Sequence, residues 1–251
     1  VKKIIFEQSK AIGVIFQIGK KEKKFFANKE IIISAGAINT PKILQLSGIG
    51  DQKHLEHLGI KCIFNNHLVG ENLRDHLQTK IIYETKSKKN FNYLLKNKLV
   101  LIVELLKYFL KKDSLLNEGA IKAGAFCNLN DDKKYEYQLN LLLASGIDVS
   151  SIDKFNGLTL SVNTLNPRSK GFVKIKSNNF LKDPMIFPNY FSDKNNKDIQ
   201  KHIDGIKKIR EIANTKPFKD ILIKEKLPGA FCKTNLQISE FIKNCSTTIY
   251  H

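Results

Sequence analysis

The 251-residue sequence has no tryptophan, one methionine and four cysteines. The cysteines, which are too scattered for a Cys-x-x-Cys pair or a zinc set, are interpreted as reduced thiols of a cytoplasmic protein. Long apolar runs are also missing, since the run Leu99–Val103 ends at Glu104, far short of the length of a membrane span. These absences exclude a disulfide framework and a membrane-crossing helix.

Arginine is scarce although the formal net charge is +18. The arginines are Arg74, Arg168 and Arg210, and lysine provides all the other positive charge, spread along the whole chain. Arginine is the residue that makes bidentate contacts to phosphates and bases, so its scarcity favours a solvated lysine surface. We therefore predict no nucleic-acid partner and keep a basic module that binds polyanions or a membrane surface as an alternative class of function.

A dinucleotide-binding glycine motif is missing as well. The pair Gly48 and Gly50 follows a predicted helix rather than a strand, and Lys53 stands where the third glycine would be. The chain also starts at Val1 with residues that already have the pattern of a strand. We therefore expect this sequence to be an internal segment of a longer protein.

The sequence that is present is organised around residues 31–50. Its β-branched start, Ile31 to Ile33, predicts a strand, and Thr40 followed by Pro41 predicts the N-cap and first position of a helix that ends near Gly48. Such a junction points backbone N–H groups and the positive end of a helix dipole at small residues that let an anionic ligand approach. An ordinary structural turn has the same pattern, so the junction alone does not distinguish an anion-binding site from a plain turn.

Periodicity predicts the remaining elements. We expect strands at residues 1–6, 11–18 and 25–33 with a turn at 20–24, strands at 119–126, 137–143 and 157–165 in an antiparallel sheet, and helices at 51–60, 198–213 and 236–244. His54 and His57 have the i, i+3 spacing of metal ligands, but no third ligand is near and we predict no metal. His202 is expected on the charged face of its helix, without a role.

Residues 91–112 have apolar residues at helical spacing with lysines between them. A basic amphipathic helix of this kind can lie on an anionic membrane. A buried helix whose lysines reach solvent is the more common outcome, and it is the expectation here.

Three separated segments resemble the glucose–methanol–choline (GMC) family of FAD-dependent alcohol oxidoreductases. They are Gly36-Ala37-x-x-Thr40-Pro41 with its downstream Ser47-Gly-Ile-Gly50, then Gly70-x-Asn72-Leu73-x-Asp75-His76, and finally residues 166–193. The resemblance implies a mixed α/β (α+β) fold: part of a Rossmann-like FAD-binding domain at 1–78 and a substrate domain at 79–250 with an antiparallel sheet flanked by helices. Residues 165–250 would start the family's C-terminal region, and His251 the return to the FAD domain.

The resemblance also implies the site. FAD is the predicted cofactor, and the predicted contacts are Ala35, Gly36, Ala37, Asn39, Thr40, Gly70 and Asn72. His251, at the end of Thr248-x-Tyr250-His251, matches the family's approach to its active-site histidine and is the predicted proton acceptor. Asp75 and His76 are interpreted as a structural pair more readily than as catalytic residues.

The predicted function is oxidation of a small alcohol to an aldehyde, with a hydride passing to the flavin and oxygen or a quinone as the final acceptor. Choline-acting relatives carry a glutamate where this sequence has Lys122, and a cation does not stabilise a quaternary ammonium, so choline is not the expected substrate. The alternatives are a non-redox lyase of the same fold that keeps FAD, and the basic module described above. A peripheral membrane contact is left open.

Overall fold

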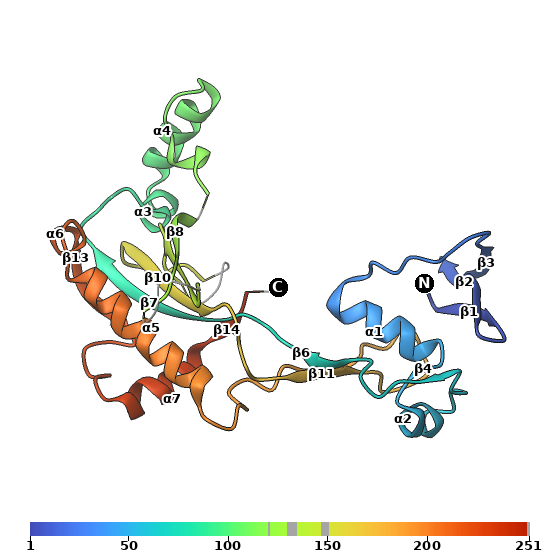
Figure 1. Cartoon of the computed structure of the whole chain (residues 1–251). Coiled ribbons are helices and arrows are strands. Elements are labelled where there is room, and N and C mark those ends of the chain that lie inside the picture. Colours follow the sequence, from blue (N-terminus) through green and yellow to red (C-terminus); the bar gives the residue numbers. More distant parts are fainter. Residues whose placement is uncertain (120, 130–134, 147–150, 250–251) are drawn as a thin grey trace. The chain divides into compact units, whose positions relative to one another are not determined.

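The computed structural model (Figure 1) describes the whole chain except residues 120, 130–134, 147–150 and 250–251. The chain forms two compact units. Unit 1 contains Val1–Arg74 and Arg168–Ser192, and unit 2 contains Asp75–Pro167 and Asp193–His251. The predicted boundaries differ from this division, because they assign residues 168–192 to the substrate domain. These residues lie in unit 1 because one of their strands, β11 (Gly171–Lys174), pairs with β6 (Glu71–Leu73).

Unit 1 is built from short elements. They are β1 (Lys3–Glu7), β2 (Lys10–Ile18), β3 (Lys21–Phe26), α1 (Gly36–Leu46), β4 (Ile49–Gly50), α2 (Gln52–His57), β5 (Phe64–Asn65), β6 (Glu71–Leu73), β11 (Gly171–Lys174) and β12 (Met185–Phe187). The first three strands form an antiparallel sheet. The predicted turn at 20–24 is wrong: Ile18 pairs with Lys21, so the turn is Gly19-Lys20, and Gly19 has the positive φ of +59° that a two-residue hairpin loop requires.

The start of α1 also differs from the prediction. The helix begins at Gly36, and Pro41 lies inside it. Thr40 is not an N-cap; its Oγ1 instead accepts a hydrogen bond of 3.2 Å from the Ala35 N–H. Residues 31–33 are not in a strand, because a strand needs a hydrogen-bonded neighbour and nothing in the described part of the chain pairs with them.

The core of unit 1 joins these elements. Leu46, Leu55 and Ile175 are buried together. Beside them, Asp51 caps α2 by accepting a 2.9 Å hydrogen bond from the His54 N–H, so this helix forms as predicted. The second sheet of the unit has the order β12-β11-β6, and α1 packs against β11.

Unit 2 is built on an antiparallel sheet with the strand order β13-β7-β10-β9-β8, and β14 also pairs with β7. Its elements are β7 (Leu77–Thr85), α3 (Phe91–Lys96), α4 (Lys98–Phe109), η1 (Leu115–Asn117), β8 (Ile121–Cys127), β9 (Tyr137–Leu142), β10 (Gly157–Thr164), α5 (Lys197–Ala213), α6 (Phe218–Ile221), β13 (Leu222–Leu227), α7 (Asn235–Cys245) and β14 (Thr247–Thr248). The predicted antiparallel sheet flanked by helices is confirmed.

Helix α5 lies along one face of this sheet (Figure 1). Its buried isoleucines recur at helical spacing, and the second helix on this face, α7, adds Ile238 and Ile242. A Cβ added to Gly205 would lie 2.6 Å from the Val162 side chain of β10, so glycine permits the close approach of helix and sheet. The predicted helices at 198–213 and 236–244 are therefore confirmed as α5 and α7.

His202 corrects one expectation. It lies on the buried face of α5, not on the charged face, and is 1% exposed. Its Nδ1 is 3.0 Å from Thr79 Oγ1 on β7, and its Nε2 is 3.4 Å from Thr164 Oγ1 on β10. The sequence does indicate that His202 is buried, because position 202 is three residues after Ile199 and four before Ile206, on the apolar face of the helix.

Burial makes the stability of unit 2 depend on pH through His202. Loss of solvation lowers the pKa of its imidazole from 6.5 to about 4, with attraction to Asp198 acting in the opposite direction. The unfolded chain then binds the extra proton, so stability is full above pH 6.5 and falls as the pH drops toward 4. We expect the free energy of unfolding in urea to decrease by about 2 kcal/mol between pH 7 and pH 5.

The His202→Gln variant should lose this slope whatever its absolute stability, whereas His57→Gln, at an exposed position of α2, should keep it. A slope that survives in His202→Gln would assign the pH dependence to other groups.

The segment 91–112 differs most from its prediction. It forms two helices, α3 and α4, on either side of Asn97, whose side chain accepts a hydrogen bond of 3.4 Å from the Val100 N–H at the start of α4. The expected burial is wrong, since no residue of α4 is buried. Within the described residues, no helix has both the length and the apolar character needed to cross a membrane.

Candidate functional site

A pocket of about 340 Å³ in unit 1 lies beside the first half of α1. Helix α1 contributes Ala37, Thr40, Pro41 and Leu44. The rest of the lining is the segment from Val69 to Arg74, which leads into and includes β6, and Val173 of β11. All three motifs that carry the resemblance therefore contribute residues to one cavity.

The start of α1 provides a positive potential at this pocket. Among the described residues no side chain caps the helix, and its first turn has no acidic residue. The first N–H groups of a helix have no partner within the helix, and the aligned peptide dipoles place partial positive charge there. The arrangement suits a negatively charged group such as a phosphate.

Gly70 is required by the pocket wall. Its φ is +86°, which a residue with a side chain rarely adopts. A Cβ at this position would lie 2.1 Å from the Val173 carbonyl oxygen and 2.6 Å from Gln45 Nε2. The Val173 N–H in turn donates a hydrogen bond of 2.6 Å to the Gly70 carbonyl oxygen. The backbones of the loop and of β11 are thus in direct contact.

Gln45 holds the two sides of the pocket together. It is 2% exposed, and its side-chain N–H donates a hydrogen bond of 2.9 Å to the Val173 carbonyl oxygen. Its Oε1 accepts a hydrogen bond of 3.0 Å from the Ile175 N–H. Because a buried amide that satisfies two backbone groups has one orientation, α1 and β11 are held in a defined register. Gln45 was not among the predicted site residues. Its position between Leu44 and Leu46, on the predicted apolar face of the helix, does indicate a polar side chain with a buried partner.

The rim of the pocket contains a neutral, a negatively charged and a positively charged side chain. Asn72 is exposed and has a φ of +62°, a left-handed conformation that asparagine tolerates better than most residues. Glu71 forms an ion pair with Lys174 across the β6–β11 pair at 2.8 Å, and Arg74 also lines the pocket. Arg74 was not predicted as a site residue.

The structure brings four of the predicted cofactor contacts to the pocket: Ala37, Thr40, Gly70 and Asn72. Ala35, Gly36 and Asn39 do not line it; Ala35 is bonded to Thr40 instead, and Gly36 and Asn39 are exposed at the start of α1. His251 lies outside the described residues. Contact of any of these residues with a cofactor stays a prediction.

Lys122 lines a different pocket, of about 410 Å³, within unit 2. The ladder between β8 and β9 shifts register between Ile121 and Ala123, so Lys122 sits at a bulge. Its ammonium forms an ion pair with the carboxylate of Glu118, which also lines the pocket. The charge at this position is therefore already matched by a neighbour.

His76 of the second motif and His54 of α2 have structural partners. His76 Nε2 lies 2.9 Å from the Leu165 carbonyl oxygen and His54 Nε2 lies 3.0 Å from the Ile175 carbonyl oxygen. Both are consistent with a ring N–H that donates to a backbone oxygen. Across the described residues, no group of three His, Cys, Asp or Glu side chains is placed to hold a metal ion.

Comparison with known protein families finds two matches. A model of the N-terminal GMC oxidoreductase domain matches residues 1–78, and a model of the C-terminal GMC oxidoreductase domain matches residues 167–251. The two matches together cover more than half of the chain.

Individual proteins agree with the family matches. The chain is 33% identical to an oxygen-dependent choline dehydrogenase of Staphylococcus xylosus, over 100% of this chain and 44% of the relative. It is 32% identical to an alcohol dehydrogenase [acceptor] of Pseudomonas putida, over 99% of this chain and 46% of the relative. The chain thus spans less than half the length of these relatives.

A solved structure has the same fold. It is a FAD-dependent oxidoreductase from Chaetomium thermophilum, which superposes with a TM-score of 0.85 at 24% sequence identity. The superposition covers 98% of this chain and 49% of that one. At this level of identity, the likeness describes the fold alone.

Proposed function

Since this chain belongs to the GMC oxidoreductase family, we propose that it is part of an FAD-dependent enzyme that oxidises a small primary alcohol to an aldehyde. The observation that carries the proposal is the unit 1 pocket, which places Ala37, Thr40, Gly70 and Asn72 around one cavity at an uncapped helix N-terminus. A family member with an anionic cofactor needs such a cavity.

The residues at the pocket fit a cofactor with a pyrophosphate. The N-terminus of α1 would hold negative charge, and Asn72 and Arg74 would donate hydrogen bonds at the rim. The small side chain of Ala37 and the absent side chain of Gly70 let a flat ring or a phosphate approach the backbone. The buried Gln45 amide keeps these elements in place before the cofactor binds.

Bound FAD would supply the acceptor for a hydride. In the proposed reaction the C–H bond of the alcohol carbon breaks with its electron pair, and the O–H proton passes to the imidazole of His251. Imidazole suits this step because its ordinary pKa of about 6.5 lets it take and release a proton near neutral pH. The assignment to His251 rests on its motif.

The proposed substrates are uncharged alcohols. A quaternary ammonium group is attracted by a carboxylate or an aromatic face. At Lys122 it would find no free carboxylate, because the carboxylate of Glu118 is already paired with the Lys122 ammonium. A chain with this ion pair in its substrate pocket should discriminate against choline, although several of its relatives are named for choline.

The test uses the full-length protein. Its visible spectrum is recorded without oxygen, before and after addition of uncharged primary alcohols and of choline. We expect a flavin band that the uncharged alcohols bleach. Choline should bleach it at least tenfold more slowly, since a quaternary ammonium without a free carboxylate partner lacks an attraction of more than about 1.4 kcal/mol. The His251→Ala variant should keep the flavin band and bleach 100-fold or more slowly.

The control for that variant is His57→Ala, which removes an exposed histidine of α2 and should bleach at the wild-type rate. A colourless protein would contradict FAD as the cofactor. A yellow protein that no alcohol bleaches would contradict the oxidation and favour a lyase that keeps FAD.

A further inference from the structure

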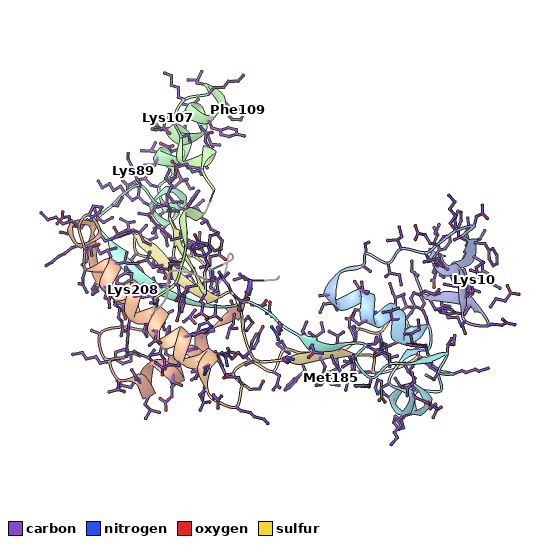
Figure 2. The ribbon with its side chains drawn as sticks, in the orientation of Figure 1. Lys10, Lys89, Lys107, Phe109, Met185 and Lys208 are labelled. Atoms are coloured by element: carbon purple, nitrogen blue, oxygen red, sulfur yellow. The ribbon has the colours of Figure 1, made fainter. Side chains whose placement is uncertain are left out.

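The outer side of α4 is apolar, which is the reverse of an ordinary surface helix. Its most exposed apolar side chains follow the spacing i, i+3, i+4, i+7, so they form one stripe along the helix. The stripe consists of Leu99, Ile102, Val103, Leu106, Phe109 and Leu110, and each is at least half exposed. Figure 2 shows the Phe109 ring on the outside of α4. We refer to these six residues as the α4 stripe.

Two polar residues of α4, Glu104 and Lys107, lie on the side of the helix that lines the unit 2 pocket. Glu104 accepts hydrogen bonds from the Leu115 N–H at 2.8 Å and from Lys107 Nζ at 2.7 Å, and the Ser114 hydroxyl lies 2.9 Å from it. Its side chain is 14% exposed. Val100, Glu104 and Lys107, none of which belongs to the stripe, line the unit 2 pocket. The helix is therefore anchored by its polar face, and the stripe is left without a covering element in the described structure.

Lysines stand at both ends of the stripe. Lys96 and Lys98 are exposed at its start, and Lys111 and Lys112 are exposed at its end, against one exposed carboxylate, that of Asp113. An apolar strip bracketed by cations matches the boundary between the acyl chains and the negatively charged headgroups of a membrane leaflet. The chain as a whole adds an excess of positive charge, +18.

A second copy of the chain fits less well. Two copies would bring the same four lysines together, with no matching acidic cluster. The helix has 12 residues, so the stripe is about 18 Å long and about 10 Å wide. A stable protein interface buries roughly 800 Å² on each partner, which a strip of this size does not reach.

We propose that α4 is an interfacial helix that lies in the plane of a membrane and binds anionic lipid through the α4 stripe and its flanking lysines. At 12 residues the helix is too short to span a bilayer. The contact is peripheral: the stripe enters the acyl boundary, and Lys96, Lys98, Lys111 and Lys112 reach the headgroups.

The test is flotation of the full-length protein with vesicles of phosphatidylcholine alone or mixed in equal parts with phosphatidylglycerol, at about 0.1 M salt. The wild type should float with the mixed vesicles. The Leu99→Gln/Phe109→Gln variant should bind them at least tenfold more weakly, because two large apolar side chains no longer enter the membrane. The Lys111→Gln/Lys112→Gln variant should lose a similar factor on mixed vesicles and nothing on neutral ones.

The chain offers a matched control. Leu99 and Phe109 are 76% and 75% exposed, and Leu236 and Phe231, in unit 2 but outside α4, are 70% and 78% exposed. The Leu236→Gln/Phe231→Gln variant should float like the wild type. Equal loss in both double variants, or a wild type that does not float with mixed vesicles, would overturn the proposal.

Two further outcomes would overturn it by identifying another occupant. One is a concentration-dependent dimer that Leu99→Gln/Phe109→Gln abolishes in the absence of lipid. The other is strong hydrogen-exchange protection of residues 98–109 in the lipid-free full-length protein, which would show that the rest of the chain covers the stripe.

Discussion

The Gly70→Ala variant is expected to lose about 3 kcal/mol or more of stability in unit 1. Two costs add up at this position. The backbone φ of +86° is unfavourable for a residue with a Cβ. The new Cβ would also lie 2.1 Å from the Val173 carbonyl oxygen and 2.6 Å from Gln45 Nε2, so the loop and β11 must separate. Urea unfolding followed by circular dichroism measures the change.

The matched control is Gly59→Ala. Gly59 has a similar φ of +71°, but nothing lies within 4 Å of the added Cβ. This variant pays only the backbone cost, about 1 kcal/mol. The difference between the two variants therefore measures the contact of Gly70 with β11. If both variants lose the same stability, the pocket wall does not need the close approach.

The same variant tests the proposed cofactor site. Because Gly70 holds the pocket segment against α1 and β11, displacement of this segment moves Asn72 and Arg74 away from the N-terminus of α1. The full-length Gly70→Ala protein should retain at least tenfold less flavin than the Gly59→Ala protein after dialysis. Equal retention would place the cofactor contact elsewhere in the protein.

The second large effect is expected at Arg210. Its guanidinium on α5 forms two hydrogen bonds to Glu225 on β13, with Nε to Oε2 at 3.0 Å and Nη2 to Oε1 at 2.7 Å. The Arg210 side chain is 22% exposed and that of Glu225 is 12% exposed. Tyr83 and the Gly229 N–H also donate to the same carboxylate, at 3.3 and 3.2 Å. The pair joins α5 to an edge strand of the sheet.

The Arg210→Met variant keeps most of the side-chain volume and removes the charge. It should destabilise unit 2 by about 3 kcal/mol, because it leaves the Glu225 carboxylate in a largely buried position without its cation. Adding Glu225→Gln should recover part of this loss, since the neutral amide is less costly to bury. Chemical denaturation of the single and double variants checks both expectations.

Lys208→Met is the control for Arg210→Met. Lys208 lies two residues away on α5 (Figure 2), and its ion pair with Glu211 has side chains that are 40% and 65% exposed. Exposed pairs contribute little, so a loss of under about 0.5 kcal/mol is expected. A loss at Arg210 no larger than that at Lys208 would show that the Arg210 pair does not hold the sheet edge.

The sequence alone determined the elements whose signal is local. Strands β9 and β10 and helices α5 and α7 were predicted within one or two residues, because apolar spacing reports which side of an element is buried. It also determined the family, since three short motifs in the family's order identify it. Ala37, Thr40, Gly70 and Asn72, which line one pocket, all belong to those motifs, and their contact with a cofactor stays a prediction.

Tertiary structure decided which partner each residue contacts. Thr40 has the pattern of an N-cap, but its hydroxyl bonds to Ala35; Gln45 carries no motif, but it fastens α1 to residues about 130 positions later. The position of His202 in the sequence is compatible with either the buried or the charged face of α5, and in the structure it is buried. The α4 stripe has the pattern of a buried helix and is exposed. Periodicity records that a face is apolar, whereas burial depends on which distant segment, lipid or ligand covers that face, and only the folded arrangement decides this.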